Sequence, residues 1–573
     1  MPDSSAHPSP QTPVLQLQHV QLDYAGRRST VRALDDVSFE VAPGEIVALV
    51  GESGSGKSTI ASAVTGLLPP SARITGGRVL LGGQDVAGKR ERAWSRLRGR
   101  AVGLVPQDPG ASLTPVLTIG AQVAEVLAVR GERLGRAERR RRCIELLEVA
   151  EVPRAAERLS QYPHELSGGL KQRILIAMAF GLEPSLVVAD EPTSALDVTV
   201  QRQVLRVFDR LVREHSSSVL FVTHDIALAA DHASRALVLQ RGRLVDDVRV
   251  DDAVRPGAAS GYTGQLLEHA RSTLVAVPAQ RHEAPDDSGG ATSAAPVLDV
   301  RGLRHTFPAA RGRGEVVAVD DVSFTVPRGQ TVALVGESGS GKSTTARAVL
   351  RLLDADAGQV LVDGVDVSTA SGRARKALWR SAQLVHQNPD SSLDPRWTVA
   401  RTIGEPLAAL GPGGAAQRRQ RVEELLDAVG LPPEVADRLP AALSGGQRQR
   451  VAIARALAPR SSLVVLDEAL SALDVITQER VLGLLRTIQA DHGVSYLFIS
   501  HDLATVRLLA QHVVVMKGGR VVEQGPAAQL FSAPQTEYAR ELLAAVPGHR
   551  LLASASGSTA AASPAPAASG APR

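Results

Sequence analysis

Short apolar runs rich in valine, leucine and isoleucine alternate along the chain with longer stretches of helical periodicity. Residues 47–50, 186–188 and 463–465 are such runs, whereas residues 174–179 (Ile-Leu-Ile-Ala-Met-Ala) belong to a longer helical pattern. Brief apolar runs of this kind are typical of buried strands, and their alternation with helices indicates a largely parallel sheet. The pattern therefore predicts an α/β protein.

The same motifs occur twice, in the same order. Residues 33–39 (Ala-Leu-Asp-Asp-Val-Ser-Phe) return as residues 318–324 (Ala-Val-Asp-Asp-Val-Ser-Phe), and residues 47–59 recur unchanged at 332–344. This order and spacing indicate a duplicated domain. The segment between the two copies is rich in Ala, Pro, Asp, Ser and Gly, which is typical of a flexible linker. The expected organisation is a first domain at 14–275, a linker at 276–296, a second domain at 297–548 and a disordered tail at 549–573.

Composition and charge narrow the class of protein. A chain of 573 residues, 44% of them hydrophobic, can bury a large core, and its formal charge of only +4 gives no argument for a nucleic-acid partner. The single cysteine, Cys143, excludes an internal disulfide and any all-cysteine metal or iron–sulfur site, which is typical of a reducing compartment. No signal peptide is visible, and no apolar run approaches the roughly 18–20 residues that cross a bilayer. Any membrane role is therefore expected to come through a partner.

Each copy carries the pattern GxxxxGK[ST] directly after an apolar strand. Glycines in this pattern let backbone N–H groups surround phosphate, the lysine reaches the β- and γ-phosphates, and the following serine hydroxyl ligates Mg²⁺. The chain is therefore predicted to bind two nucleotides. The phosphate-binding residues are expected to be Gly51, Ser53, Gly54, Gly56, Lys57, Ser58 and Thr59 in the first copy, and Gly336, Ser338, Gly339, Gly341, Lys342, Ser343 and Thr344 in the second.

An Asp-Glu pair ends a predicted buried strand in each copy, at Asp190–Glu191 and at Asp467–Glu468. Beside a phosphate loop, the aspartate at such a strand end holds the Mg²⁺ shell, and the glutamate can polarise the attacking water. The simpler alternative is that both acids cap the following helix. We favour the catalytic interpretation because a phosphate loop is present in each copy.

Two further polar residues follow strands in each copy. Gln107 and Gln387 can contact both metal and water, and His224 and His501 can hydrogen-bond the γ-phosphate. Alone, a glutamine or histidine at a strand end is more often structural. Their repetition in the same order is what makes these four residues candidates.

A Leu-Ser-Gly-Gly sequence precedes a helical pattern in each copy. A helix that starts in this way presents free N–H groups and the positive end of its dipole, so it forms a second anion site. We expect each such helix start to close over the phosphate loop of the other copy. The residues concerned are Ser167, Gly168 and Gly169, and Ser444, Gly445, Gly446 and Gln447.

Together these motifs resemble the ATP-binding cassette (ABC) superfamily, whose Walker A, Q-loop, signature, Walker B, D-loop and switch-histidine motifs occur here in order, twice. The resemblance implies two P-loop NTPase domains, each with a RecA-like core and a helical subdomain, which hydrolyse ATP with Mg²⁺. It places the metal at Ser58, Gln107 and Asp190, and at Ser343, Gln387 and Asp467. It also implies an aromatic residue that stacks on adenine, for which Tyr24 and Phe307 are the best matches.

A narrower resemblance follows each Q-loop glutamine. The sequences Gln-Asp-Pro-Gly-Ala-Ser-Leu-Thr-Pro (107–115) and Gln-Asn-Pro-Asp-Ser-Ser-Leu-Asp-Pro (387–395) are similar to those of dipeptide, oligopeptide and nickel importer ATPases. This implies two ATPase subunits fused in one chain, docked at the cytoplasmic face of the plasma membrane on two permease subunits that receive solute from an extracytoplasmic binding protein. The chain departs from the family pattern at Leu170, at residues 441–442 and at residues 469–470.

Two other functions compete with import. A soluble twin-cassette factor acting on ribosomes or DNA is disfavoured, because the linker is short and Pro/Ala-rich and zinc-binding cysteines are absent. An exporter ATPase is disfavoured by the sequences that follow the Q-loops. The transported solute cannot be named from the sequence, because its choice lies in the permease and the binding protein.

Overall fold

The computed structural model describes residues 12–26, 30–52, 54–129, 134–194, 196–255, 257–275, 295–308, 314–411, 414–471 and 473–552. It consists of two units. The first comprises Met1–Leu196, Val200–Val275 and Pro547–Arg573, and the second comprises Asp197–Thr199 and Ala276–Val546. The linker expected at 276–296 lies outside the described residues except for its last two positions, and the expected tail does so except for residues 549–552.

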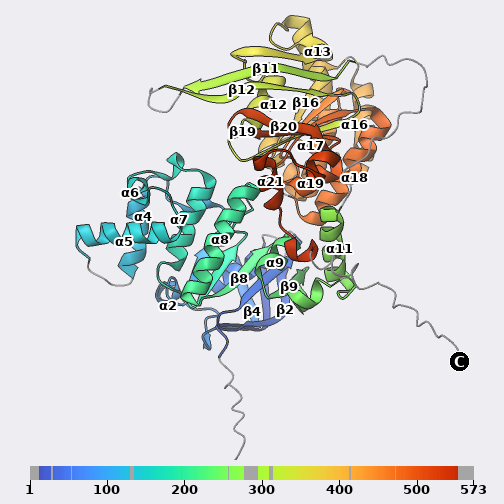
Figure 1. Cartoon of the computed structure of the whole chain (residues 1–573). Coiled ribbons are helices and arrows are strands. Elements are labelled where there is room, and N and C mark those ends of the chain that lie inside the picture. The colour runs from blue at the N-terminus through green and yellow to red at the C-terminus, as the bar shows by residue number, and fades with distance from the viewer. Residues whose placement is uncertain are drawn as a thin grey trace, which may run out of the picture. The chain divides into compact units, whose positions relative to one another are not determined.

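A six-stranded sheet forms the centre of each unit (Figure 1). Its order is β10-β9-β3-β8-β7-β6 in the first unit and β20-β19-β13-β18-β17-β16 in the second. All neighbouring strands are parallel except for the outermost pairs, β9–β10 and β19–β20. The strands of the first unit are β3 (Ile46–Gly51), β6 (Val102–Val105), β7 (Leu186–Asp190), β8 (Ser218–Thr223), β9 (Arg235–Gln240) and β10 (Arg243–Arg249). Those of the second are β13 (Thr331–Val335), β16 (Ala382–Val385), β17 (Leu463–Asp467), β18 (Ser495–Ile499), β19 (His512–Lys517) and β20 (Arg520–Pro526).

Each unit also has a four-stranded antiparallel sheet, which the sequence analysis did not predict. Its order is β2-β1-β4-β5 in the first unit and β12-β11-β14-β15 in the second. The strands are β1 (Leu15–Ala25), β2 (Thr30–Val41), β4 (Ala72–Leu81) and β5 (Gln84–Asp85), and β11 (Leu298–Pro308), β12 (Glu315–Val326), β14 (Ala357–Val362) and β15 (Val365–Asp366).

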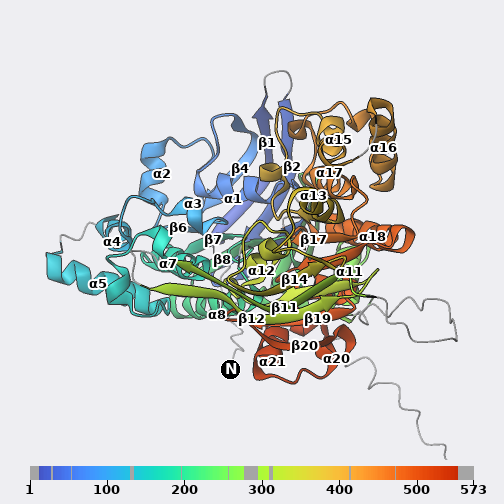
Figure 2. The same cartoon turned by 90° about the horizontal axis from the view of Figure 1, so that it is seen from above.

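Helices cover the sheets and form a separate group in each unit. Figures 1 and 2 both show α4, α5 and α7 together in the first unit, and Figure 2 shows α15, α16 and α17 together in the second. The main helices of the first unit are α1 (Lys57–Thr65), α3 (Pro109–Ser112), α4 (Ile119–Val129), α5 (Arg136–Val149), α7 (Gly168–Phe180), α8 (Val198–His215), α9 (Ile226–His232) and α11 (Gly261–Val275). Their counterparts in the second are α12 (Lys342–Val349), α14 (Pro389–Ser392), α15 (Val399–Leu410), α16 (Ala415–Ala428), α17 (Gly445–Leu457), α18 (Val475–His492), α19 (Leu503–Leu509) and α21 (Glu537–Ala544).

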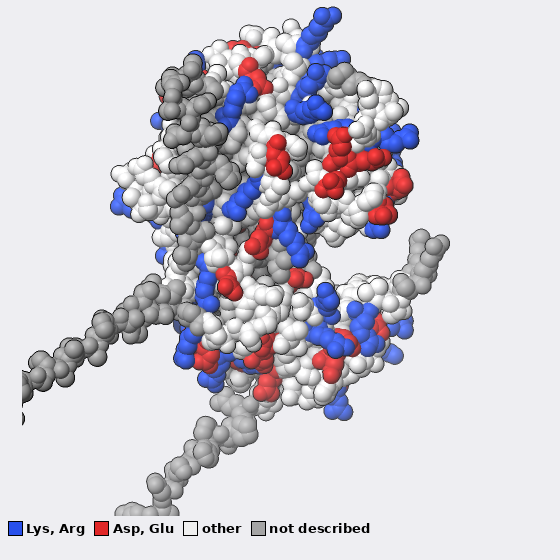
Figure 3. All heavy atoms as spheres, turned by 90° about the vertical axis from the view of Figure 1, so that its right-hand side faces the viewer, with Lys and Arg blue, Asp and Glu red and all other residues white. Residues whose placement is uncertain are grey.

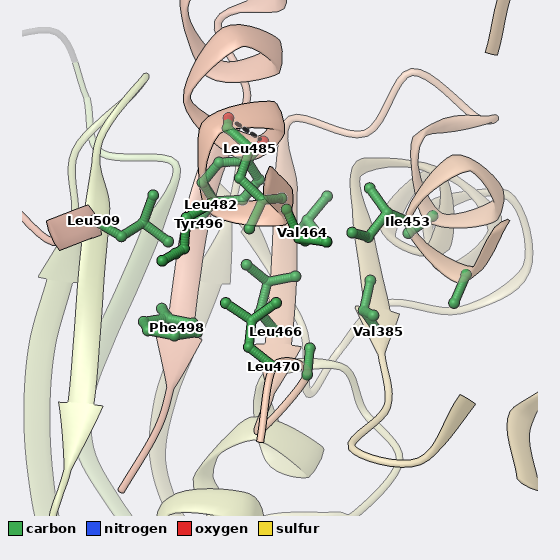
Figure 4. Packing of buried hydrophobic residues seen from close by; sticks show 14 of the residues in the cluster. Val385, Ile453, Val464, Leu466, Leu470, Leu482, Leu485, Tyr496, Phe498 and Leu509 are labelled. Atoms are coloured by element: carbon green, nitrogen blue, oxygen red, sulfur yellow. Dashed lines mark hydrogen bonds between the residues drawn. The ribbon is translucent and has the colours of Figure 1, made fainter. Parts of the chain in front are cut away.

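The central strands are buried on both faces, which is why they read as continuous apolar runs. Along β17, Val464 and Leu466 face one hydrophobic cluster, whereas Leu463 and Val465 face another. Figure 4 shows the first cluster, where the hydroxyl of buried Tyr496 donates a hydrogen bond to the carbonyl of Leu485 at 3.0 Å. The core of the second unit therefore lies on either side of its parallel sheet.

Residues 548–552 belong to the first unit although they end the described chain. The carboxylate of Asp231, on α9, accepts hydrogen bonds from the backbone N–H groups of Gly548, His549 and Arg550 at 2.7, 3.2 and 3.0 Å. Leu551 is fully buried. The start of the predicted tail is thus held by three charge-assisted hydrogen bonds to one side chain.

Acidic and basic side chains are interspersed over the face of the molecule drawn in Figure 3. A surface of mixed sign does not create the extended field of one sign that attracts polyanions. This face therefore gives no more argument for a nucleic-acid partner than the small net charge does.

At Gly77, on β4, the backbone of the antiparallel sheet in the first unit comes close to the backbone of β1. Gly77 has φ +78°, and a Cβ there would lie 2.3 Å from the carbonyl oxygens of both Gln18 and His19. Gly82 has φ +53° but open space around its Cβ position. We expect Gly82→Ala to cost about 1–2 kcal/mol, the penalty of a left-handed alanine. Gly77→Ala should cost clearly more, measured by urea unfolding of the whole chain. Equal losses would show that the clash is relieved at no cost.

Candidate functional site

The two phosphate loops join a central strand to the helix that follows it. In the first unit the loop connects β3 to α1, and Gly54 and Gly56 have φ of +78° and +109°. In the second it connects β13 to α12, and Gly339 and Gly341 have φ of +81° and +101°. These left-handed glycines turn successive N–H groups inward, which forms an anion-binding concavity at a helix N-terminus. Ser53, a predicted loop residue, lies outside the described residues.

The lysine of each loop is buried and held by the loop itself. Lys57 is 6% exposed, and its Nζ donates to the carbonyls of Gly51 and Glu52 at 2.7 and 2.8 Å. Lys342 is 5% exposed and donates to Gly336 and Glu337, both at 2.7 Å. Burial lowers the pKa of Lys342 against the effect of nearby carboxylates. The ammonium groups are therefore positioned to exchange carbonyl for phosphate oxygens.

Of the three residues predicted to hold Mg²⁺ in each copy, the serine and the aspartate contact each other beside the loop, whereas the glutamines, Gln107 and Gln387, donate to Glu191 and Glu468 instead. The Ser58 hydroxyl donates to Asp190 Oδ1 at 3.4 Å, and the Ser343 hydroxyl donates to Asp467 Oδ1 at 3.1 Å. No group of three or more histidine, cysteine or acidic side chains that could hold a metal occurs among the described residues. One hydroxyl and one carboxylate fit Mg²⁺, which takes its remaining ligands from phosphates and water.

A second cluster in the first unit centres on Glu191. Gln107 Nε2 donates to Glu191 Oε2 at 2.8 Å, and His224 Nδ1 lies 3.1 Å from Glu191 Oε1. The three residues follow β6, β7 and β8, which are parallel neighbours. They meet because the carboxyl ends of parallel strands lie at the same edge of the sheet.

The second unit repeats this cluster around Glu468. Gln387 Nε2 donates to Glu468 Oε2 at 2.6 Å, and His501 Nδ1 lies 3.4 Å from Glu468 Oε1. The structure thus brings together the glutamate, glutamine and histidine that the sequence analysis selected in each copy.

The two acids at each strand end have opposite pKa shifts. Burial and the charge of Glu191 raise the pKa of Asp190. Burial also opposes ionisation of Glu191, but the hydrogen bond and charge of His224 outweigh it and lower the pKa of Glu191. The same relation holds in the second unit, where the pKa of Asp467 is raised by burial and that of Glu468 is lowered, against burial, by His501. The glutamates are therefore the carboxylates favoured in the ionised state.

Both glutamates have a strained backbone. Glu191 has φ +45° and Glu468 has φ +48°. A non-glycine residue costs about 1–3 kcal/mol in such a conformation and keeps it only where its surroundings enforce it. Here the Glu191 N–H donates to Val222 and the Glu468 N–H donates to Ile499, both at 2.9 Å. These bonds extend the sheet pairing by one residue beyond the aspartates and aim the glutamates away from the strand.

The signature serines cap the helices α7 and α17. Ser444 Oγ accepts from the Gln447 N–H at 3.3 Å, and Gln447 Oε1 accepts from the Ser444 N–H at 3.0 Å, which completes a capping box. In α7, Ser167 Oγ accepts from the Leu170 N–H at 3.4 Å, but leucine cannot return the bond. The departure at Leu170 therefore removes one cap interaction and leaves the predicted anion-binding helix start in place.

The other departures concern local structure rather than reacting groups. In the first unit Glu165 Oε2 accepts from the Tyr162 N–H at 2.8 Å, and Ala442 at the corresponding position of the second unit cannot form this bond. The short 3-10 helix Pro440–Ala442 forms nevertheless. Leu470 is buried in the core drawn in Figure 4. Neither change removes a hydrogen bond from the Glu468 cluster.

The two candidate adenine-stacking residues differ in their contacts. The Tyr24 hydroxyl lies 3.4 Å from the Thr59 hydroxyl, so its ring stands beside the first phosphate loop. Phe307 is 38% exposed, and its ring packs edge-on against His305 at a centroid distance of 4.6 Å. His305, to which the sequence analysis assigned no role, lies two residues before Phe307 on β11.

Tyr538 is a further residue at the second site that the sequence analysis did not select for it. Its hydroxyl accepts from the N–H of Glu337 in the phosphate loop at 3.1 Å, and Lys517 Nζ lies 4.3 Å from its ring centroid. Burial raises the pKa of Tyr538 to about 12, so the hydroxyl stays neutral. Helix α21 therefore supports the phosphate loop from the end of the domain.

The chain is similar to known proteins over both copies of the domain. The ABC transporter family model matches residues 34–194 and 319–471. The chain is 40% identical to the oligopeptide transport ATP-binding protein OppD of Mycobacterium tuberculosis, over 94% of this chain and 98% of that protein. It is 41% identical to the peptidoglycan transport ATP-binding protein YejF of Agrobacterium fabrum (93% and 96%) and 39% identical to the glutathione import ATP-binding protein GsiA of Salmonella typhimurium (93% and 89%).

These matches span both copies, and they confirm the predicted family and the predicted α/β fold. The chain belongs to the ABC transporter family and is an ATPase that carries two copies of its ATP-binding domain.

Proposed function

We propose that this protein is the twin ATPase of a peptide importer, in which both sites hydrolyse ATP. The observation that carries the proposal is the glutamate–glutamine–histidine cluster, which stands beside a phosphate loop in each unit. The relatives are named as ATP-binding proteins for transport of oligopeptides, peptidoglycan and glutathione, and two of these cargoes, oligopeptides and the tripeptide glutathione, are peptides. None of the described helices is long and apolar enough to cross a membrane.

Each unit supplies the groups that the reaction needs. The loop N–H groups and Lys57 bind the phosphates. Gln107 and His224 hold the ionised Glu191, which orients and polarises the attacking water. Ser58 and Asp190 would hold Mg²⁺, which would neutralise negative charge on the phosphates. Lys342, Ser343, Asp467 and the Glu468 cluster have the same roles in the second unit.

The energy of hydrolysis is delivered to other polypeptides. We infer that the protein sits peripherally at the cytoplasmic face of the plasma membrane on two permease subunits. An extracytoplasmic binding protein would deliver the peptide to these subunits. Support comes from the names of the relatives and from the segments after Gln107 and Gln387, whose sequences are similar to those of peptide importers.

The proposed bases can be tested by removing their charge. Glu191→Gln and Glu468→Gln should each lower ATP turnover strongly, because loss of a general base typically costs about 10²–10⁴-fold at its site. The double variant should lose nearly all turnover while it still binds ATP. Turnover is measured by phosphate release and binding by a fluorescent ATP analogue.

Glu148→Gln and Glu423→Gln provide the matched controls. Both glutamates are exposed on helices of the same two units, α5 and α16. These variants should keep normal turnover. A double Glu191/Glu468 variant that hydrolyses ATP at a near-normal rate would remove both glutamates from the mechanism.

Tyr24 is expected to bind adenine by stacking. Replacing an aromatic ring that stacks on a base costs about 1–3 kcal/mol, so Tyr24→Ala should weaken ATP binding about 5- to 150-fold at the first site. Tyr24→Phe should retain the affinity, since the 3.4 Å contact with Thr59 is peripheral to stacking. Binding is measured in a Glu468→Gln, Lys342→Ala background that isolates the first site. Equal affinities of the Ala and Phe variants would contradict stacking.

Transport is tested in cells that lack the gene. Deletion should abolish uptake of a toxic peptide analogue and growth on a peptide nitrogen source. The wild-type gene should restore both, and the Glu191→Gln/Glu468→Gln gene should restore neither. Normal uptake across a broad solute panel, together with co-purification of the protein on ribosomes, would favour the soluble-factor alternative instead.

A further inference from the structure

The last described residues of the chain dock on helix α9 of the first unit through two reciprocal helix caps. Residues 549–552 form one helical turn, and the Asp231 carboxylate accepts from the three N–H groups at its start. In return, the Arg550 guanidinium donates to the carbonyls of Ala230 and Ala233, at the C-terminal end of α9, at 3.0 and 3.3 Å. A carboxylate at a helix start and a cation at a helix end each complement the helix dipole. The two segments therefore stabilise each other.

Packing of apolar groups makes this docking specific. Gly548 is buried and has φ +106°, a backbone conformation that favours glycine. A Cβ at this position would lie 2.3 Å from Leu274 Cδ1 on α11 and 3.4 Å from Ala227 Cβ on α9. Leu551 is fully buried. The segment thus fits closely against two helices of the first unit, and a larger residue at position 548 would not fit.

A very short stretch of chain separates this docked segment from the core of the second unit. Ala545 is buried in a hydrophobic cluster of the second unit, whereas Gly548 is buried in the first. Three residue steps span at most about 11 Å, because an extended chain covers about 3.3–3.6 Å per residue. By the same rule, residues 276–294, which connect the two copies of the domain, reach at most about 70 Å. As long as the segment stays docked, the C-terminal connection is therefore the shorter of these two tethers.

Both ends of this short connection belong to elements of the ATP sites. Helix α9 follows His224, and the Asp225 carboxylate caps its first turn. Helix α21 ends at Ala544 and contacts the second phosphate loop through the Tyr538 hydroxyl. The docked segment thus ties a helix of the first ATP site to a helix of the second.

We propose that residues 547–552 form a clasp, which limits how far the two ATP-binding domains move apart between rounds of ATP hydrolysis. The domains then close over ATP from a restricted range of positions, so less conformational freedom is lost when they close. This inference uses the expectation that the signature helix of each copy closes over the phosphate loop of the other. It goes beyond the proposed function, because it depends on neither the transported solute nor the permease.

Single-molecule fluorescence energy transfer in the full-length protein tests the restraint. Dyes are attached at Arg206→Cys on α8 and Ala490→Cys on α18, two exposed positions, whereas the native Cys143 is buried. Without nucleotide, we expect this labelled parent protein to show a narrow distribution of transfer efficiency. Asp231→Ala removes the acceptor of three N–H groups, and Gly548→Val introduces a clash. Each should broaden the distribution toward low efficiency.

Two further variants serve as controls. Asp231→Asn keeps an oxygen that can cap the helical turn, and His549→Ala removes an exposed side chain but keeps its N–H, so both should retain the narrow distribution. With ATP, in a Glu191→Gln/Glu468→Gln background, all variants should reach the same high efficiency, which verifies that they fold. Nucleotide-free distributions of Asp231→Ala and Gly548→Val that stay as narrow as the parent's would overturn the clasp and leave the importer function standing.

The kinetics of ATP hydrolysis distinguish a clasp from a mere support of the active site. Loss of a clasp makes closing less favourable, so Asp231→Ala and Gly548→Val should raise the KM for ATP about fivefold or more. The kcat at saturating ATP should stay within about twofold of the parent value. Asp231→Asn and Glu268→Ala, the latter exposed on α11, should keep the KM unchanged. A lowered kcat at unchanged KM would overturn the inference, because the segment would then only position α9 and His224.

Discussion

Four parallel strands that end at one edge of a sheet are the constraint on which each site depends. Their register aligns Val50 with Thr223, and Asp190 with Val222. The phosphate loop, Asp190, Glu191 and His224 therefore leave the sheet at the same level, although Lys57 and His224 are far apart in sequence. Loss of one strand pairing would separate the groups without changing any of them. The apolar strands, buried on both faces, thus fix the positions of the groups at this edge.

The same edge concentrates energetically unfavourable features. It buries a lysine, sets two carboxylates next to each other in sequence and holds a glutamate at positive φ. Buried charges are costly unless hydrogen-bonded, and each of these finds its compensation locally. The carbonyls of Gly51 and Glu52 accept from Lys57, and Gln107 and His224 satisfy Glu191. Because these partners are loop carbonyls and side chains at strand ends, they can be exchanged for phosphate and water without unfolding the sheet.

Much of this arrangement could be predicted from sequence, because the motifs are local and duplicated. Short patterns around Lys57, Glu191 and His224 selected groups that the structure brings to one edge of the sheet, and their repetition separated them from ordinary strand-end residues. The antiparallel sheets were not predicted, although the alternation at Leu15, Leu17, Val20 and Leu22 is visible. Pairing of β1 with both β2 and β4 depends on bulges that shift its register, and alternation does not report them.

Contacts between segments that are distant in the chain could not be predicted from the sequence either. The hydroxyl of Tyr538 and the N–H of Glu337 meet across 201 residues, and nothing near either residue indicates the other. The same limit applies to Asp231, whose carboxylate collects N–H groups from residues more than 300 positions later. Periodicity predicts elements, and motifs predict chemistry, but such pairs depend on how whole elements pack.

Comparison of the two units shows where duplication has tolerated change. The hydrogen bonds to Glu191 and Glu468 are the same in kind, since altering one would leave a buried charge without its partner. The cap at Leu170 and the replacement at Ala442 each remove one hydrogen bond at a helix end, where water can take its place. At residues 114–117 the buried amide of Gln122 bonds to the turn backbone, whereas at residues 394–397 a surface ion pair between Asp394 and Arg396 closes the turn. The hydrogen bonds around the two glutamates are thus kept in both units, whereas helix ends and exposed turns differ between them.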